Sequence, residues 1–271
     1  MEIRLGCELQ LDCEVQTVML ALVHPHASRL ADLRGPEAVR LSPDRLSEVL
    51  VDDDGNRWCR FLAAAGRTSF RYEARLADSG LTDRQQPTAP ECAVGALPIA
   101  AYRHLNPSTY CDIERLATLA WSSFGDTPAG WPRVQAICDW IHARIRYDFG
   151  ATAPDRTASQ TLALGAGVCR DFTHLGISLS RCLNIPARYC TGYLVADPAH
   201  PEQQPVDFTT WFEAYLGDRW YAFDPRHNVP RRGRVLIGRG RDAADVPFLR
   251  SFGAHQLSGF QVISEWLEES V

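Results

Sequence analysis

The sequence contains no lysine, and all 28 of its basic residues are arginine. The chain therefore has no ε-amine of its own to be modified or cross-linked. It also contains no Cys-x-x-Cys pair, no internal repeat, and no apolar run near the ~18 residues that would span a bilayer. These absences argue against a zinc site of the usual spacing, a repeat architecture and a membrane-spanning helix.

Charge and cysteine content narrow the class of protein further. The formal net charge is −5, and the only basic cluster lies around Arg231 to Arg241, which argues against nucleic acid as a partner. The chain has nine cysteines, an odd number, and its first residues alternate instead of forming an apolar leader. We therefore expect a reduced, cytoplasmic protein with no metal, no cofactor and no membrane contact. The oligomeric state is left open.

The length and the local patterning predict two domains. A chain of 271 residues can bury one large core or two modest ones. Residues 1–85 contain short strand-like segments separated by turn signals, which predicts a β-rich, sandwich-like N-terminal domain. Residues 86–104 contain prolines and few large apolar side chains and are interpreted as a linker. Residues 105–271 form the second domain, whose C-terminal segment from 234 is expected to return onto one of the two.

Apolar spacing predicts helices and then a hairpin in the second domain. An early helix is expected to start near Asn106, and another spans residues 127–147. The next helix begins at Cys169, and its apolar face consists of Phe172, Leu175, Gly176, Leu179 and Leu183. After it, residues 187–195, 208–216 and 219–224 read as strands. The last two are joined by the two-residue turn Gly217-Asp218.

Cys169 occupies the first position of its predicted helix. Unpaired N–H groups and the helix dipole favour a thiolate there, and the same N–H groups can stabilise an oxyanion. Gly165 and Gly167 leave room for a substrate next to it. We therefore predict that Cys169 is a nucleophile that reacts even at mildly acidic pH. The alternative is a core cysteine, which is how we interpret Cys138 and Cys182.

The predicted hairpin places a carboxylate near a possible base position. If Leu216 faces Arg219, Trp211 lies opposite Asp224, and Thr209 is a diagonal neighbour of Asp224 on the same face. That face, which also carries Glu213, is assigned to the substrate cleft. The opposite face carries mostly apolar residues and is assigned to the core.

Two stretches of the chain resemble a known family. The stretches GVCRDFTHLGISLSRCLNIPARYCTGYL and DFTTWFEAYLGDRWYAFDP are similar to bacterial transglutaminase-like proteins, which have also been described as cysteine proteases. The resemblance covers residues 105–230. It implies an α+β fold with a papain-like core, helices packed on an antiparallel sheet, and a Cys–His–Asp triad. Carried over by position, Cys169 is the nucleophile and Asp224 is the acid that orients the base.

The resemblance breaks at the histidine of the triad. The family motif reads Asp-Phe-His-Ala-Trp, whereas this chain has Thr209 at the histidine position, and threonine is no base near neutral pH. His227 is the nearest substitute along the chain. It would face the core side on a continued strand, unless the turn at Pro225 bends it back towards Asp224. His174 is interpreted as a packing or capping residue, and the turn after Cys169 as solvated.

Two functions remain open at this stage. In the first, the protein is a thiol hydrolase or acyl transferase that acts on an amide or ester of a peptide or protein substrate. In the second, it is a degenerate member of the family that binds a peptide or protein in the former cleft. The missing histidine supports the second function, and the rest of the motif supports the first.

Overall fold

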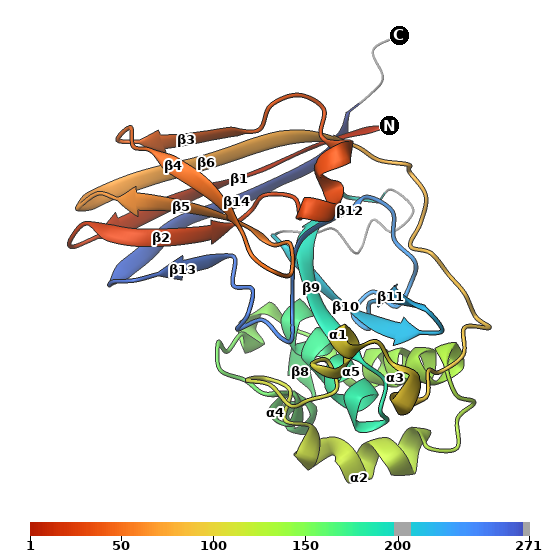
Figure 1. Cartoon of the computed structure of the whole chain (residues 1–271). Helices are drawn as coiled ribbons and strands as arrows, with labels where there is room; N and C mark the ends of the chain where they lie inside the picture. The colour runs from red at the N-terminus through yellow and green to blue at the C-terminus, as the bar shows by residue number, and fades with distance from the viewer. Residues whose placement is uncertain (198–206, 268–271) are drawn as a thin grey trace.

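The computed structural model describes residues 1–197 and 207–267, and the fold is α+β (Figure 1). Two antiparallel sheets of four strands form a sandwich. The first sheet has the order β14 (His255–Leu267), β1 (Glu2–Cys13), β6 (Gly66–Ala77) and β3 (Ala38–Ser42). The second has the order β13 (Leu249–Ser251), β2 (Thr17–Leu22), β5 (Arg57–Ala63) and β4 (Ser47–Val51).

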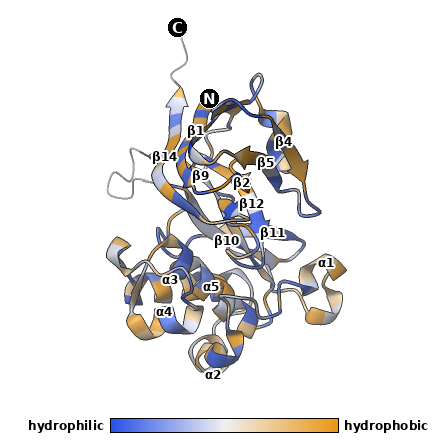
Figure 2. Ribbon diagram, turned by 90° about the vertical axis from the view of Figure 1, so that its left-hand side faces the viewer, coloured by the Kyte–Doolittle hydropathy of each residue, from blue (hydrophilic) through white to orange (hydrophobic). Residues whose placement is uncertain are grey.

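The sandwich draws strands from both ends of the chain. Alternate residues of β1, such as Leu9 and Leu11, are fully buried and share one core with Met19 and Phe61 of the second sheet. Figure 2 shows this alternation of hydrophobic and hydrophilic residues along the strands. The C-terminal strand β14 pairs with the whole length of β1, and β13 pairs with β2. Residues 249–267 therefore complete both N-terminal sheets.

The middle of the chain forms a helical layer. Its helices are α1 (Ile99–Tyr102), α2 (Ile113–Phe124), α3 (Trp131–Arg144), α4 (Ala158–Leu164) and α5 (Cys169–Cys182). The 3-10 turns are η1 (Ala27–Asp32), η2 (Val94–Ala96) and η3 (Phe149–Ala151), and a short parallel pair joins β7 (Arg146–Tyr147) to β8 (Ala166–Gly167). None of the helices in the described part of the chain is long and apolar enough to cross a membrane.

Two predicted helix starts are wrong, and both helices begin later. The helix expected from residue 127 starts at Trp131, because Gly130 has a φ of 91° that is incompatible with a helix. The helix expected near Asn106 starts at Ile113, because residues 106–112 form bends and irregular backbone. The helix predicted to begin at Cys169 does begin there.

A third sheet links the helices to the sandwich. Its order is β11 (Arg219–Phe223), β10 (Thr209–Leu216), β9 (Ala187–Leu194) and β12 (Arg234–Gly240). Leu216 pairs with Arg219 and Phe212 with Phe223, so the predicted register of the hairpin is confirmed. Gly217 has a φ of 62°, as a tight two-residue turn requires.

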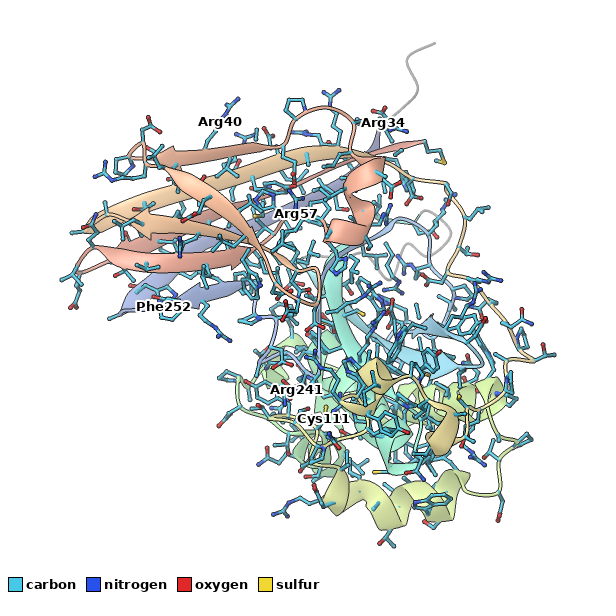
Figure 3. All side chains as sticks on the ribbon, in the orientation of Figure 1. Arg34, Arg40, Arg57, Cys111, Arg241 and Phe252 are labelled. Carbon is cyan, nitrogen blue, oxygen red and sulfur yellow. The ribbon has the colours of Figure 1, made fainter. Side chains whose placement is uncertain are left out.

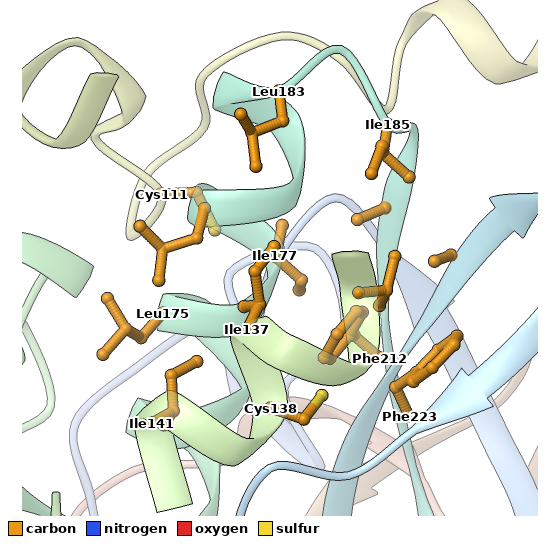
Figure 4. Close-up of a cluster of buried hydrophobic side chains, with 14 of the residues drawn as sticks. Cys111, Ile137, Cys138, Ile141, Leu175, Ile177, Leu183, Ile185, Phe212 and Phe223 are labelled. Carbon is orange, nitrogen blue, oxygen red and sulfur yellow. The ribbon is translucent and has the colours of Figure 1, made fainter. Parts of the chain in front are cut away.

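Helix α5 packs closely on the apolar face of this sheet. A Cβ atom on Gly176 would lie 2.6 Å from a ring carbon of Phe212, so glycine allows the helix and the strand to approach each other. Figure 4 shows Phe212 and Phe223 pointing into the same cluster as Ile137 and Cys138 of α3. This packing fixes the position of α5, and therefore of its first residue, Cys169, relative to β10.

Candidate active site

The first turn of α5 is held by a buried carboxylate. The Val168 N–H donates a hydrogen bond to Asp171 Oδ2 at 2.8 Å, and Arg156 Nη1 lies 3.3 Å from the same oxygen. Asp171 is fully buried, so the expectation that this turn is solvated is wrong. The carboxylate accepts an otherwise unpaired N–H at the helix start, and the arginine offsets its charge. Cys169 therefore begins a rigid helix.

Cys169 is a half-buried residue whose thiol has charged and polar neighbours. Burial raises the pKa of Cys169 above its ordinary value of 9.0, and the nearby carboxylate of Asp207 raises this pKa further. Arg226, the hydroxyl of Thr210 and the N–H of Arg170 act in the opposite direction. The net direction of the pKa is upward, which disfavours the thiolate expected at mildly acidic pH. The helix N-terminus does not compensate for burial and a neighbouring negative charge.

Cys169 opens into a cavity of about 730 Å³ between the helical layer and the sandwich. Asp207, Thr210 and Arg170 lie at this cavity together with the thiol. At its edge, Tyr147 stacks under the guanidinium of Arg226, 3.8 Å from the ring centroid. The remaining lining is largely apolar and includes Phe149, Val246, Pro247, Leu249 and the rings of Phe208, Phe248 and Phe260. A volume of this size suits a small ligand or part of a peptide.

A second polar cluster surrounds Asp224 after the end of β11. Asp224 Oδ2 lies 2.8 Å from His227 Nδ1 and accepts a hydrogen bond from Arg234 Nη2 at 2.9 Å. Arg234 Nε also bonds Asp83 at 3.2 Å. Burial alone would raise the pKa of Asp224, but His227 and Arg234 hold it well below its usual range. Asp224 is therefore a buried carboxylate that fixes the imidazole and its tautomer.

The turn at Pro225 bends His227 back onto Asp224. The backbone N–H of His227 lies 3.2 Å from Asp224 Oδ1, and the Asn228 N–H bonds the Asp224 carbonyl at 2.7 Å. The ring is buried, and its Nε2 has no hydrogen-bond partner within residues 1–197 and 207–267. No hydrogen bond therefore joins Nε2 to Cys169. The structure brings Asp224 and His227 together, with Cys169 in a separate group of contacts.

Two residues assigned to the cleft lie on the other face of the sheet. Trp211 is buried under the guanidinium of Arg234, 4.7 Å from the ring centroid, and packs with Cys190 and Leu236. Glu213 forms ion pairs with arginines, the shortest involving Arg188. Neither side chain lines the cavity at Cys169, so the structure places both residues outside this cavity. The nucleophile belongs to the helix that covers the apolar face, and the cavity continues that face.

The neighbouring threonines divide between the two faces. Thr210 points towards α5, where its hydroxyl lies 2.9 Å from that of Thr173. Thr209, at the position of the family histidine, is buried and does not line the cavity. Its hydroxyl has no hydrogen-bond partner among the described residues. Asp224 Oδ2 is bound by His227 and Arg234, so Thr209 takes no part in holding this carboxylate.

Sequence reasoning missed three residues around the thiol, namely Asp207, Thr210 and Arg226. Asp207 is the first residue of the quoted motif, and its carboxyl pKa is raised by burial and lowered in part by Arg226. Thr210 lies two residues before Phe212 and therefore on the same, apolar face of β10. This spacing is the signal that could have placed Thr210 beside the helix. Arg226 lies in an irregular loop, and no periodic signal indicates where it points.

The described residues contain no group of three or more His, Cys, Asp or Glu side chains arranged to hold a metal ion. His174 is buried between the rings of Tyr110 and Tyr189. Its Nε2 accepts a hydrogen bond from the Ala243 N–H at 3.2 Å. The side chains in this region that could take part in a reaction are therefore the thiol of Cys169, the carboxylate of Asp207 and the Asp224–His227 pair.

Comparisons with known proteins agree with this architecture. The sequence profile of the transglutaminase-like superfamily matches residues 121–225. A crystal structure described as that of a "putative cysteine protease" from Cytophaga hutchinsonii is 32% identical, with a TM-score of 0.86. It covers 100% of this chain, and the match spans 92% of that protein.

Uncharacterized mycobacterial proteins are also similar. One from Mycobacterium leprae is 28% identical over 154 residues, which is 54% of this chain and 53% of the relative. One from Mycobacterium tuberculosis is 32% identical over 133 residues, 44% of this chain and 42% of the relative. The chain thus matches about half the length of these curated relatives.

Proposed function

Because the chain belongs to the transglutaminase-like superfamily, we propose that it is a thiol enzyme. It transfers or hydrolyses the acyl group of an amide or ester on a peptide-like substrate. The observation that carries this proposal is Cys169, a half-buried residue at the first position of α5 that lines an open cavity of about 730 Å³. A nucleophile, a place for its substrate and the backbone N–H groups of a helix start occur there together.

The proposed reaction has two steps. The sulfur of Cys169 attacks the carbonyl carbon, and its proton passes to a base while N–H groups of the first turn of α5 stabilise the oxyanion. Collapse of the tetrahedral intermediate breaks the bond to the leaving amine or alcohol, which takes a proton, and leaves a thioester on Cys169. Water or an amine then attacks the thioester and restores the thiol.

The proposed base is His227, oriented by Asp224. Support comes from the 2.8 Å contact between Nδ1 and the carboxylate, which leaves Nε2 without a partner among the described residues. Histidine thus reaches the orienting carboxylate from the loop after β11, and Thr209 replaces it on β10. Since Nε2 makes no hydrogen bond to the sulfur, the proposal requires substrate binding to bring the two groups within reach. Catalytic contacts are often long in the free enzyme.

The second candidate is a binding module that has lost catalysis. The raised pKa of Cys169 and the lack of a hydrogen bond from the imidazole to the sulfur favour this alternative. It retains the cavity, which would hold a peptide or protein partner without turnover. The two candidates differ in whether an acyl group is transferred to Cys169 and then released.

Acyl-enzyme trapping tests the proposal. The protein is mixed with a p-nitrophenyl ester, quenched within seconds and examined by peptide mass spectrometry. We expect the acyl mass on the Cys169 peptide, steady release of nitrophenol, and loss of both in Cys169→Ser. Cys92→Ser is the matched control, because Cys92 is also partly exposed but does not line the cavity. Steady turnover that persists in Cys169→Ser rejects the enzyme assignment, and an absence of turnover supports the binding module.

A further inference from the structure

The cavity at Cys169 has an aromatic wall that the C-terminal return segment largely provides. Phe248 lies before β13 and Phe260 lies on β14, and their rings stack with centroids 4.9 Å apart. Phe208, just before β10, joins both, at 6.0 Å from Phe248 and 5.8 Å from Phe260. All three rings line the cavity. They form what we call the aromatic wall, defined as Phe208, Phe248 and Phe260.

The aromatic wall is exposed mainly at Phe260, because Phe208 is buried, and it is apolar where the region around the thiol is polar. Phe260 is 38% exposed, a large apolar surface to leave in water beside a cavity. Around the sulfur the cavity has Asp207, Thr210 and the N–H of Arg170 instead. A molecule whose carbonyl carbon meets the sulfur would find polar partners for its reacting group and apolar partners for a side group.

We infer that the preferred acyl donor carries a bulky apolar or aromatic side group that binds against the aromatic wall. This inference rests on the proposed function for the role of Cys169, and it adds the substrate class. Phe248 and Phe260 lie outside residues 121–225, which match the family profile. Specificity therefore resides in the return segment, and the chemistry resides in the core that the family shares.

A pair of electrophiles with the same reactive group measures this preference without requiring turnover. N-benzyl-chloroacetamide and N-methyl-chloroacetamide both alkylate a thiolate with loss of chloride, and they differ only in the side group. The ratio of their second-order rate constants on Cys169, measured by peptide mass spectrometry, reports binding of the benzyl ring. We expect a ratio of roughly 10 to 100 in favour of the benzyl compound, because an apolar pocket discriminates by about this factor.

Variants of the aromatic wall should reduce this ratio. Phe260→Ala is expected to reduce it roughly tenfold, and Phe248→Ala to a similar extent, since each removes one side of the stack. The matched control is Phe252→Ala. Phe252 belongs to the same return segment but is 63% exposed and lies outside the cavity lining, near the end of β13 (Figure 3). Phe260→Leu keeps an apolar side chain on β14, so it supplies the result if the alanine variant fails to fold.

Each outcome bears on the inference. A ratio near 1 in the wild type, an unchanged ratio in Phe260→Leu and Phe248→Ala, or no labelling of Cys169 overturns it. A high ratio that these variants lower and Phe252→Ala preserves supports it. Failure of the proposed function looks different. If Cys169 is labelled selectively but no acyl product is ever released, the aromatic site exists and the proposed enzyme activity does not. If the protein turns over the ester but shows no selectivity, the enzyme activity exists and the aromatic site does not.

Discussion

The surroundings of Cys169 disfavour the ionised form of its thiol, whereas the surroundings of Asp224, next to His227, favour the ionised form of its carboxylate. The thiol opens into a large cavity, and both burial and the charge of Asp207 disfavour its ionised form. The imidazole is buried, and His227 and Arg234 stabilise the ionised form of Asp224. The Asp224–His227 pair is thus already formed in the free protein, whereas the thiol needs a base to become a nucleophile. Under the proposed function, substrate binding brings His227 within reach of Cys169 and so supplies that base.

Of the changes in these two regions, removing the thiol should have the largest effect on ester turnover. Cys169→Ser is expected to lower ester turnover roughly 10³-fold or more, because the hydroxyl is a far weaker nucleophile at neutral pH. The carboxylate–imidazole region should remain intact, so the urea midpoint should change little. A variant that retains most of its turnover would mean that the cavity thiol is not the nucleophile.

Removing the charge of Asp224 should affect both catalysis and stability. Asp224→Asn leaves His227 and Arg234 without their shared carboxylate, and breaking a buried pair of this kind costs about 3–5 kcal/mol of unfolding free energy. Turnover should fall roughly 10²- to 10⁴-fold as the imidazole loses its orientation. Urea unfolding and ester kinetics measure the two effects. Wild-type stability in this variant would contradict the proposed role of the network.

Acid titration should reveal the same network. The pKa of Asp224 is held below its unfolded value of about 3.9, so its contribution to stability is complete above that value. The contribution is lost as the pH falls towards the folded pKa. Asp224→Asn should therefore lose less stability than the wild type between about pH 4 and pH 2. Equal losses in urea titrations over this range would contradict the depressed pKa.

A smaller effect is expected from changing Asp207, which tests how neighbouring charges control the reactivity of the Cys169 thiol. Asp207→Asn removes a negative charge that raises the pKa of Cys169, so alkylation by iodoacetamide at pH 7 should accelerate several-fold. Arg226→Gln should slow it, because the guanidinium lowers the same pKa. Mass spectrometry of the Cys169 peptide measures both rates. If both variants change the rate in the same direction, electrostatic control of the thiol is excluded.

The smallest effect is expected on the far face of the sheet. Glu213→Gln weakens a mostly buried ion pair with Arg188 that lies outside the cavity lining. We expect the steady-state turnover number to change less than about threefold, and the unfolding free energy to fall by about 1–3 kcal/mol because Arg188 loses a buried partner. A loss of turnover close to that expected for Asp224→Asn would indicate that the substrate binds on the face that carries Glu213.

The sequence predicted the elements of the site better than it predicted their faces. The start of α5 at Cys169 and the hairpin register follow from local rules of spacing and turn geometry, and both are confirmed. The cleft was assigned to the polar face of β10, where Trp211 and Glu213 lie. Because the helix that begins at Cys169 must cover the apolar face, the thiol had to lie on that face too.

Other parts of the site depend on tertiary structure that no local pattern encodes. The course of the chain after Pro225 decides that His227 reaches Asp224, and this turn depends on hydrogen bonds to the Asp224 carboxylate and carbonyl. The aromatic wall requires the pairing of β14 with β1, between segments about 250 residues apart in the sequence. The raised pKa of Cys169 depends on burial by residues from several elements.

The pH dependence of Cys169 acylation in the wild type and in His227→Ala tests the central claim most directly. Rapid mixing with the activated ester gives the acylation rate from about pH 6 to pH 10. The account predicts that the wild type is acylated roughly 10²-fold faster than the variant near neutral pH. The two rates should converge only at a pH above 9.0, because burial raises the pKa of Cys169 beyond this ordinary value. Superimposable profiles across the whole range would contradict the assignment of His227 as the base that serves Cys169.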